Sequence, residues 1–375
     1  LAENLPLVRQ QTGLVLDPYF SGTKIEWLLN NREVRQDDDL CIGTIDSWLI
    51  WNLTGSKSFV TDCTNASRTM LFDISELCWS DQLIKMLGVQ PKFLPEVRAS
   101  SGDFGVTIQH GSVPAGISIS GVAGDQHAAL FGQACFDTGS TKNTYGTGSF
   151  VLMNVGKNCP SPRDGMLTTI AWQLGNEKPV YALEGAIFVT GAAIQWLRDG
   201  LNIIDNASEI TALAQSVDDS SGVVVVPAFT GLGSPWWDAY ARGAIFGITR
   251  GTSRAHIARA TIESIVFQTR DVVEAMSKAS GVAITELKVD GGASVIDFML
   301  QLQADHLGVE VLRPKELETT AIGAAYLAGL AKGVWQSTQD ISAAWQLEKT
   351  FTPSTKPSGY ETWQTAVKRS MNWAK

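Results

Sequence analysis

The residues with the clearest chemical potential lie in one stretch of the sequence, positions 116–150. Asp125 follows a strand-like apolar run, and a carboxylate at the carboxyl end of a buried strand faces the crevice where open α/β sheets bind ligands. Further along, Gly146, Thr147 and Gly148 form a tight glycine turn whose backbone N–H groups could hold a phosphate. A carboxylate to accept a proton and a turn to hold a phosphate are the minimum equipment for phosphoryl transfer.

The same residues also fit purely structural roles. A lone Asp after a strand is often a helix N-cap, and a glycine turn between two strands is by default a hairpin. Phe150 could belong to the core, Tyr19 to ordinary surface packing, and His127 is best interpreted as a packed histidine. Spacing alone therefore leaves both interpretations open.

Length and composition limit the class of protein. A chain of 375 residues is too long for one compact core, so we expect two domains. The formal net charge of −9, with no basic stripe, argues against nucleic acid as the main partner. Five cysteines without a CxxC motif favour a reducing, cytoplasmic environment over a disulfide framework or a zinc site. No apolar run is long enough for a membrane span.

The helices and strands that position these residues can be predicted from the spacing of apolar residues and from the turn residues between them. The segment 62–68 has the composition of a polar loop, and a long amphipathic helix is predicted over 254–280, with Ser253 as its cap and Gly281 just past its end. The second half of the chain restarts a strand–turn–helix pattern. Strands are predicted at 142–145, 150–154, 167–173, 180–183, 222–227 and 287–290, and helices at 186–198 and 321–330.

This order of elements predicts an α/β protein with two domains around a cleft. No GxGxxG follows a strand, which argues against a Rossmann dinucleotide site, and no GxxxxGK[ST] motif occurs, so the phosphate chemistry is not of the P-loop kind. The turn at Gly291 and Gly292, between a strand and a helix start, is a further place where a nucleotide could meet a helix N-terminus.

Two long patterns, at 19–28 and 243–263, make the chain resemble the FGGY family of carbohydrate kinases. The segments 62–68, 124–126 and 227–233 are similar to those of the glycerol kinases within that family. The resemblance runs over essentially the whole chain. It implies an α/β fold of two actin-like ATPase (ribonuclease H-like) domains flanking a cleft. Residues 1–136 would be the first, glycerol-side domain, and 137–375 the nucleotide-side domain with a C-terminal helix.

The resemblance also implies an activity, the ATP-dependent phosphorylation of glycerol to sn-glycerol 3-phosphate, with Mg²⁺ as cofactor. Asp125 would be the general base and would lie near the metal. The protein would be a cytoplasmic homo-oligomer, a dimer or tetramer. The remaining implied contacts are Tyr19, Gln126 and Phe150 for glycerol, and Thr147, Gly148, Gly191, Gln195, Gly292 and Ala293 for the nucleotide.

Three departures from the family pattern lead to further expectations. The family's amino-terminal portion is absent before Leu1, so the first domain is expected to be incomplete and this chain alone to be inactive. Ile296 replaces an amide side chain that helps hold adenine in relatives, which bears on nucleotide affinity. The loop 109–113 lacks the arginine that relatives use for an inhibitory sugar bisphosphate.

Two alternatives stay open at this stage. The chain could phosphorylate another polyol or a ketose within the same family, which a substrate panel would decide. It could also be a catalytically dead homologue that has kept the fold for binding.

Overall fold

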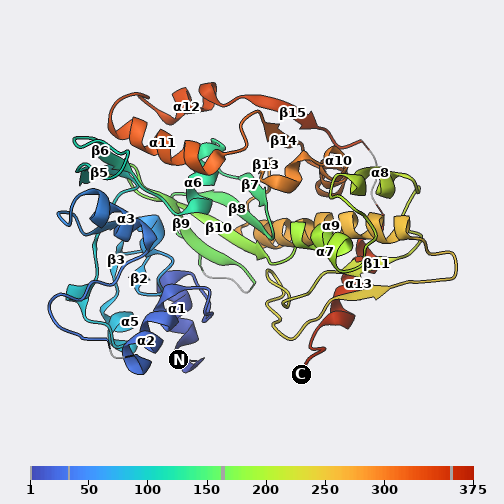
Figure 1. Ribbon diagram of the computed structural model, residues 1–375, viewed down its shortest axis with the longest axis horizontal. Helices are drawn as coiled ribbons and strands as arrows, with labels where there is room; N and C mark the ends of the chain where they lie inside the picture. Colours follow the sequence, from blue (N-terminus) through green and yellow to red (C-terminus); the bar gives the residue numbers. More distant parts are fainter. Residues whose placement is uncertain (1, 33, 162–164, 355–357) are drawn as a thin grey trace.

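A seven-stranded sheet forms the centre of the protein, seen in a computed structural model that describes residues 2–32, 34–161, 165–354 and 358–375 (Figure 1). The strand order is β15-β14-β13-β7-β8-β10-β9. Strands β7, β8, β10 and β9 are antiparallel neighbours, whereas β13 and β14 run parallel to β7 on its other side. The strands are β7 (Ser140–Tyr145), β8 (Ser149–Gly156), β9 (Leu167–Trp172), β10 (Val180–Ile187), β13 (Glu286–Asp290), β14 (Val311–Pro314) and β15 (Leu347–Phe351).

Helices cover both faces of this sheet. Helices α6 (Asp125–Gly132) and α11 (Thr319–Ala331) share a buried cluster with Leu152 of β8. The long helix α9 (Arg254–Ser280) packs on the opposite face, where it contacts Val151 and Met153 of the same strand. Successive side chains of a strand point to opposite faces, so β8 supplies both layers of the core. The result is a helix–sheet–helix arrangement, which confirms the α/β prediction.

Helix α9 has the bounds that its sequence signals predict. At its start, the Ser253 side chain and His256 form a reciprocal capping box. At its end, Gly281 adopts a φ of 72°, the left-handed conformation that a glycine tolerates without steric cost. These local signals define one of the two layers that hold the sheet.

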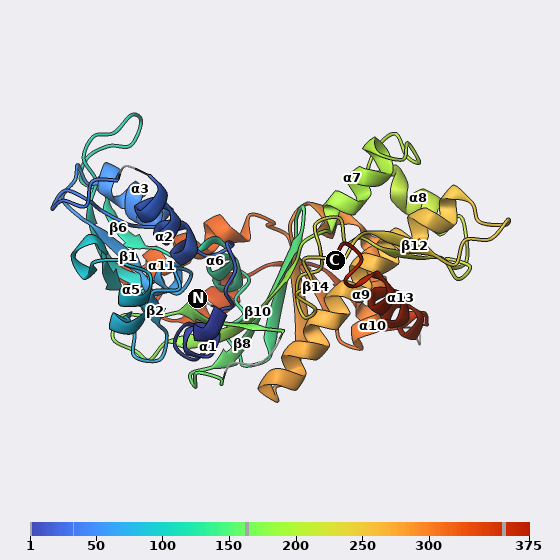
Figure 2. The ribbon, with the colours of Figure 1, turned by 90° about the horizontal axis from the view of Figure 1, so that it is seen from below.

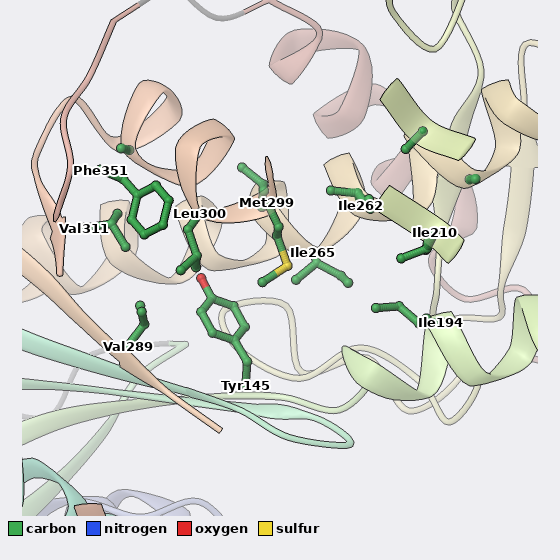
Figure 3. Close-up of a cluster of buried hydrophobic side chains, with 14 of the residues drawn as sticks. Tyr145, Ile194, Ile210, Ile262, Ile265, Val289, Met299, Leu300, Val311 and Phe351 are labelled. Atoms are coloured by element: carbon green, nitrogen blue, oxygen red, sulfur yellow. The ribbon is translucent and has the colours of Figure 1, made fainter. Parts of the chain in front are cut away.

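A buried cluster fixes the end of β7 at the glycine turn. Tyr145 is fully buried among apolar side chains of α9 and α10 (Asp297–Leu307), as Figure 3 shows. Its hydroxyl donates a hydrogen bond of 2.9 Å to Oε1 of Gln303. The residue directly before Gly146 is therefore held by both packing and a hydrogen bond.

The first part of the chain builds a separate lobe from short elements. Figure 2 shows this lobe on one side of the central strands and the α7–α8 region on the other. Among the described residues, the strands of the first lobe form two-stranded sheets only: β1 with β4, β2 with β3, and β5 with β6. Its elements are η1 (Ala2–Asn4), α1 (Leu5–Thr12), α2 (Ser21–Asn31), α3 (Ile45–Leu53), β1 (Val60–Asp62), α4 (Cys63–Ala66), β2 (Phe72–Asp73), β3 (Cys78–Trp79), α5 (Asp81–Met86), η2 (Pro91–Phe93), β4 (Glu96–Arg98), β5 (Ser101–Val106) and β6 (Ser118–Gly121).

The remaining elements lie outside the seven-stranded sheet and the first lobe. Strands β11 and β12 form a two-stranded antiparallel pair beside α9. These elements are α7 (Gly191–Asp199), α8 (Glu209–Gln215), β11 (Val224–Val226), β12 (Ala244–Phe246), η3 (Gly292–Val295), α12 (Thr338–Ala344) and α13 (Tyr360–Ser370). No helix in the described ranges is both long and apolar enough to cross a bilayer.

Two sequence-based predictions are wrong. The helix predicted from residue 186 begins only at Gly191, because Ala186 and Ile187 extend β10 by pairing with Phe150 and Ser149 of β8. The predicted polar loop 62–68 contains the helical turn α4, which follows directly from β1. In the first case, pairing with a neighbouring strand decides the local conformation, and in the second Asp62 caps the helical turn locally.

Candidate functional site

Asp125 lies in a pocket of about 530 Å³ where the first lobe meets the central sheet. We call it the Asp125 pocket. Both apolar side chains and charged or amide side chains line it. The lining residues are Tyr19, Phe20, Ser21, Ile45, Asp46, Leu49, Asn65, Arg68, Ala123, Gly124, Asp125, Gln126, His127, Glu184 and Thr320.

Asp125 is the first residue of α6, and it is exposed in the pocket. Its Oδ1 accepts a hydrogen bond of 2.7 Å from the backbone N–H of Gln126. The helix N-terminus carries partial positive charge, which complements an acidic side chain at this position. His127, by contrast, is buried, and burial holds the pKa of its imidazole well below the usual value. The interpretation of His127 as a packed histidine is confirmed.

The backbone before Asp125 is held by a residue from the first lobe. Oγ1 of Thr64 accepts a hydrogen bond of 2.8 Å from the backbone N–H of Gly124. The same hydroxyl donates to Oδ1 of Asp62 at 2.9 Å. The N–H of Gly124, the residue before α6, thereby has an acceptor, and the position of Asp125 is fixed relative to α4.

Asp62 organises that support. Its buried carboxylate accepts hydrogen bonds from the backbone N–H groups of Thr64 and Asn65, which makes it the N-cap of α4, and from Oγ of Ser100 at 2.7 Å. Burial raises the pKa of the Asp62 carboxyl to about 6, although the hydrogen bonds oppose that rise. The Asp62 carboxylate thereby connects α4 to Ser100, the residue directly before β5.

Arg68 and Glu184 cross the boundary between the lobe and the sheet. Nη2 of Arg68 lies 2.8 Å from Oε1 of Glu184, whose side chain is only 1% exposed. The second atom of each group, Nη1 and Oε2, is buried without a hydrogen-bond partner among the described residues. A buried pair with unused donor and acceptor atoms at a pocket wall is suited to bind a polar ligand.

Tyr19 forms the more open wall of the Asp125 pocket. Its ring is half-exposed and lies edge-on to Phe20, with the guanidinium of Arg68 5.8 Å from the ring centre. Partial burial raises the pKa of the Tyr19 phenol, the carboxylate of Glu184 raises it further, and Arg68 lowers it. Tyr19 therefore stays protonated near neutral pH and offers both an apolar face and an O–H donor.

A second cavity, of about 600 Å³, lies along the glycine turn. We call it the hairpin groove. It is bounded by the turn itself, one side of α7 and the residues that follow β13. The lining residues are Tyr145, Gly146, Thr147, Gly191, Ile194, Gln195, Arg198, Ala207, Ser208, Thr211, Gly292, Ala293, Val295 and Ile296.

The turn rests on the first residues of α7. The backbone N–H of Gly191 donates to the carbonyl of Gly146 at 3.0 Å, and that of Ala192 donates to the carbonyl of Thr147 at 3.1 Å. Gly148 packs so closely that an added Cβ would lie 2.3 Å from the carbonyl oxygen of Ile187. A side chain at this position would displace the turn, which explains why the position is glycine.

Most of the residues expected to contact a ligand gather in these two cavities. The Asp125 pocket contains Tyr19, Asp125 and Gln126, and the hairpin groove contains Thr147, Gly191, Gln195, Gly292 and Ala293. Ile296, which replaces an amide of relatives, also lines the groove.

Two expected contact residues lie beside the cavities. Phe150 is half-buried and packs against the cluster beneath α6, and it is not among the described residues that line the Asp125 pocket. Gly148 lies one residue beyond the part of the turn that faces the groove.

Sequence reasoning missed several groups of the Asp125 pocket. Glu184 lies in a strand predicted to end one residue earlier, and nothing local marks its carboxylate as buried. Thr64 and Arg68 belong to a segment interpreted as a loop. No local signal identified these groups, because their burial and their contacts depend on distant parts of the chain.

The donor set at the site suits one kind of metal ion. No group of three or more His, Cys, Asp or Glu residues in the described ranges could enclose a metal. Mg²⁺ in kinases is commonly held by one or two carboxylates together with phosphate oxygens and water. The exposed carboxylate of Asp125 fits that mode of binding, and a closed site of the zinc type does not fit.

Comparison with protein families matches both parts of the chain. Residues 2–132 match the N-terminal domain, and residues 141–332 the C-terminal domain, of the FGGY family of carbohydrate kinases. Together these segments include every residue that lines the Asp125 pocket and the hairpin groove.

Individual relatives are similar over nearly the full chain. Glycerol kinase 2 of Thermotoga maritima is 54% identical over 376 residues, which cover 98% of this chain and 75% of the relative. The glycerol kinase of Caldanaerobacter subterraneus subsp. tengcongensis is 55% identical with the same coverage of both chains.

Among solved structures, a glycerol kinase of Plasmodium falciparum with ADP superimposes with a TM-score of 0.90 at 36% identity. It covers 98% of this chain and 75% of its own chain. A xylulose kinase of Lactobacillus acidophilus has a TM-score of 0.83 at 23% identity and covers 98% and 74%, which shows the shared fold.

Proposed function

Because the chain belongs to the FGGY family of carbohydrate kinases, with its two-domain actin-like ATPase fold, we propose that it transfers the γ-phosphoryl group of ATP to glycerol. The observation that carries the proposal is the presence of two cavities, one with a carboxylate and one beside a glycine turn. An exposed Asp125 begins α6 in one, and a glycine turn seated on α7 borders the other. Relatives of more than 50% identity named glycerol kinases support this choice of substrate.

In this mechanism Asp125 is the catalytic base. Its carboxylate accepts the proton of a terminal glycerol hydroxyl as that oxygen attacks the γ-phosphorus, and the bond from phosphorus to the β,γ-bridging oxygen breaks to release ADP. Gln126 and Tyr19 orient glycerol within the pocket, the first through its carboxamide and the second through its ring and hydroxyl. Phe150 does not line the pocket and would act on glycerol only indirectly, through the cluster beneath α6.

The nucleotide fits the hairpin groove. Thr147 and Gly148 approach the phosphates with their backbone, and a Cβ at position 148 would displace that backbone. Gly191 and Gln195 follow the nucleotide along α7, and Gly292 with Ala293 back the adenosine. Asp125 would hold Mg²⁺ together with phosphate oxygens, and the bound ion would neutralise charge on the transferring group.

The experiment is a coupled assay of ADP release with Mg-ATP and glycerol, run on the chain as encoded by its gene. A matched Asp125→Asn variant and a panel of polyols and ketoses complete it. Glycerol-dependent turnover that falls about 10³-fold in the variant supports the proposal, because a positioned base contributes on this scale. Turnover with a ketose but not with glycerol would overturn the choice of substrate. Folded protein with no turnover on any substrate would overturn the activity.

Three further expectations from the resemblance stay predictions. We propose that the domains divide at residues 136 and 137, that the protein forms a homo-oligomer and that it acts in the cytoplasm. Limited proteolysis tests the division, light scattering tests the oligomer, and cell fractionation tests the location.

A further inference from the structure

Two lysines occupy directly paired positions on neighbouring strands of the central sheet. Lys142 on β7 and Lys288 on β13 are register partners, and both side chains are almost completely buried. They point toward the same helix but reach opposite ends of it. Lys288 contacts the carboxyl end of α6, and Lys142 contacts Gln126 in its first turn.

The role of Lys288 is structural. Its Nζ donates to the carbonyl oxygens of Gln133 and Ala134 at 3.0 and 3.2 Å, and Oε1 of Glu286 lies 3.3 Å away. A cation is favoured at a helix carboxyl end, where the last carbonyls lack intrahelical partners. Lys288 is therefore a cap whose charge is balanced by protein groups.

Lys142 has no such balance. Its Nζ donates to Oε1 of Gln126 and, at 2.9 Å, to Oγ1 of Thr144, and it forms no ion pair within the described part of the chain. It also lies at the helix end whose partial charge is positive. Burial lowers the pKa of its ammonium, and the carboxylates of Asp290, Glu184 and Asp125 oppose that shift from a longer distance. A buried cation in this position costs stability, so capping does not explain it.

The contact determines which way the carboxamide of Gln126 faces. An ammonium group only donates hydrogen bonds, so its partner on Gln126 must be the oxygen. Gln126 is half-buried at the edge of the Asp125 pocket, and its Nε2 has no hydrogen-bond partner among the described residues. With Oε1 turned to Lys142, the two N–H donors of Nε2 are directed to the pocket.

We propose that Lys142 is a positioning residue that locks Gln126 with its N–H₂ group toward the substrate. The pocket then presents an acceptor, Asp125, beside a donor, Gln126. A vicinal hydroxyl pair matches this arrangement, because one hydroxyl can donate its proton to Asp125 while the oxygen of the next accepts from Gln126. The proposal rests on the proposed function for the identity of the substrate. Gln126 donates the hydrogen bond to that substrate, and Lys142 orients Gln126 without touching the substrate itself.

The first test compares Lys142→Met with Lys288→Met. Both changes remove a buried lysine at paired positions, but only the first frees the carboxamide. We expect Lys142→Met to raise the KM for glycerol about tenfold while the KM for ATP stays unchanged, because one donor to the substrate loses its orientation. Lys288→Met should lower the thermal midpoint but leave both KM values unchanged. Equal effects of the two variants on the KM for glycerol would overturn the proposal.

A double-mutant cycle separates orientation of Gln126 from any other role. If Lys142 acts through Gln126, adding Lys142→Met to Gln126→Ala should change the KM for glycerol less than about twofold, since coupled residues are not additive. Gln126→Glu provides a second variant whose fold is secured by a new ion pair with Lys142 and which lacks the donor. It should also raise the KM for glycerol, and wild-type affinity in this variant would overturn the donor role.

A spectroscopic measurement needs no turnover. In protein labelled with ¹⁵N-glutamine, the side-chain amide signals of Gln126 are identified by their loss in Gln126→Ala. We expect their chemical shifts to lie away from those of a solvent-exposed glutamine in the wild type and to move toward those values in Lys142→Met. Unchanged Gln126 signals in Lys142→Met would overturn the inference even if glycerol turnover is observed. Absent turnover with the expected spectral change would overturn the proposed function alone.

Discussion

Arg68 and Glu184 lie 116 positions apart in the sequence and meet at 2.8 Å across the boundary between the first lobe and the central sheet. Glu184 lies on β10, and β8 separates this strand from β7. Arg68 follows α4, and Thr64 of α4 supports the backbone directly before Asp125. The pair therefore connects the two parts of the protein at the wall of the Asp125 pocket.

Arg68→Met should destabilise the protein by about 3 kcal/mol, because Glu184 would keep a buried charge without its cation. The double variant Arg68→Met with Glu184→Gln should recover part of that loss, since the uncompensated charge is removed. Urea unfolding of the single and double variants measures the coupling. Lys157→Met, which breaks an exposed pair with Glu177, is the control and should cost less than about 1 kcal/mol. Additive effects of the Arg68 and Glu184 changes would contradict the prediction.

Gly148→Ala should weaken nucleotide binding roughly tenfold, because displacing the turn misplaces the backbone that meets the phosphates. The added Cβ would lie 2.3 Å from the carbonyl oxygen of Ile187. Gly146→Ala is the matched control, since a Cβ there comes no closer than 3.5 Å to its nearest neighbour, the carbonyl oxygen of Gly148. Calorimetric titration with ADP compares the two variants. Equal affinity for ADP would show that the turn does not depend on close packing at Gly148.

Thr64→Val should reduce kcat about tenfold and leave ADP affinity unchanged, because the N–H of Gly124 loses its acceptor and Asp125 loses its support. Thr69→Val is a suitable control. Its hydroxyl likewise accepts a backbone N–H, that of Leu71, and donates to a carbonyl, that of Ala66, but it does not contact Gly124. Both variants should lose a similar free energy of unfolding. A kcat that falls equally in both would attribute the effect to general destabilisation.

The stability of the protein should depend on His306 at mildly acidic pH. Its ring packs edge-on against Phe267, and burial lowers the pKa of His306 to about 4, with the charge of Arg270 adding to the shift. The unfolded chain binds the proton more readily, so stability due to the neutral ring is present above the unfolded pKa near 6.5 and is lost as pH falls toward 4.

Comparison of wild type with His306→Gln isolates this effect. The difference in unfolding free energy between pH 7 and pH 4 should be smaller in the variant by up to about 3 kcal/mol. Asp62 and Asp271, whose carboxyl pKa values are raised by burial to about 6, change stability in the opposite direction in both proteins. They therefore cancel in the comparison, and an identical pH dependence of the two proteins would refute the role of His306.

The sequence by itself determined the features whose causes are local. The bounds of α9 follow from Ser253 and Gly281, which cap its two ends. Asp125 and the glycine turn could be identified because a carboxylate after a strand and glycines between strands have recognisable local patterns. Resemblance to a family then assigned them roles that spacing had left open.

Only the tertiary structure decided which charges are buried and what they contact. Nothing near Lys142 or Glu184 in the sequence shows that one reaches Gln126 and the other Arg68. Ala186 and Ile187 have neighbours that favour a helix, yet pairing with β8 keeps them in a strand. Such outcomes depend on the free energy of burying a group against partners that are distant in the sequence. Local propensity and periodicity carry no information about these partners.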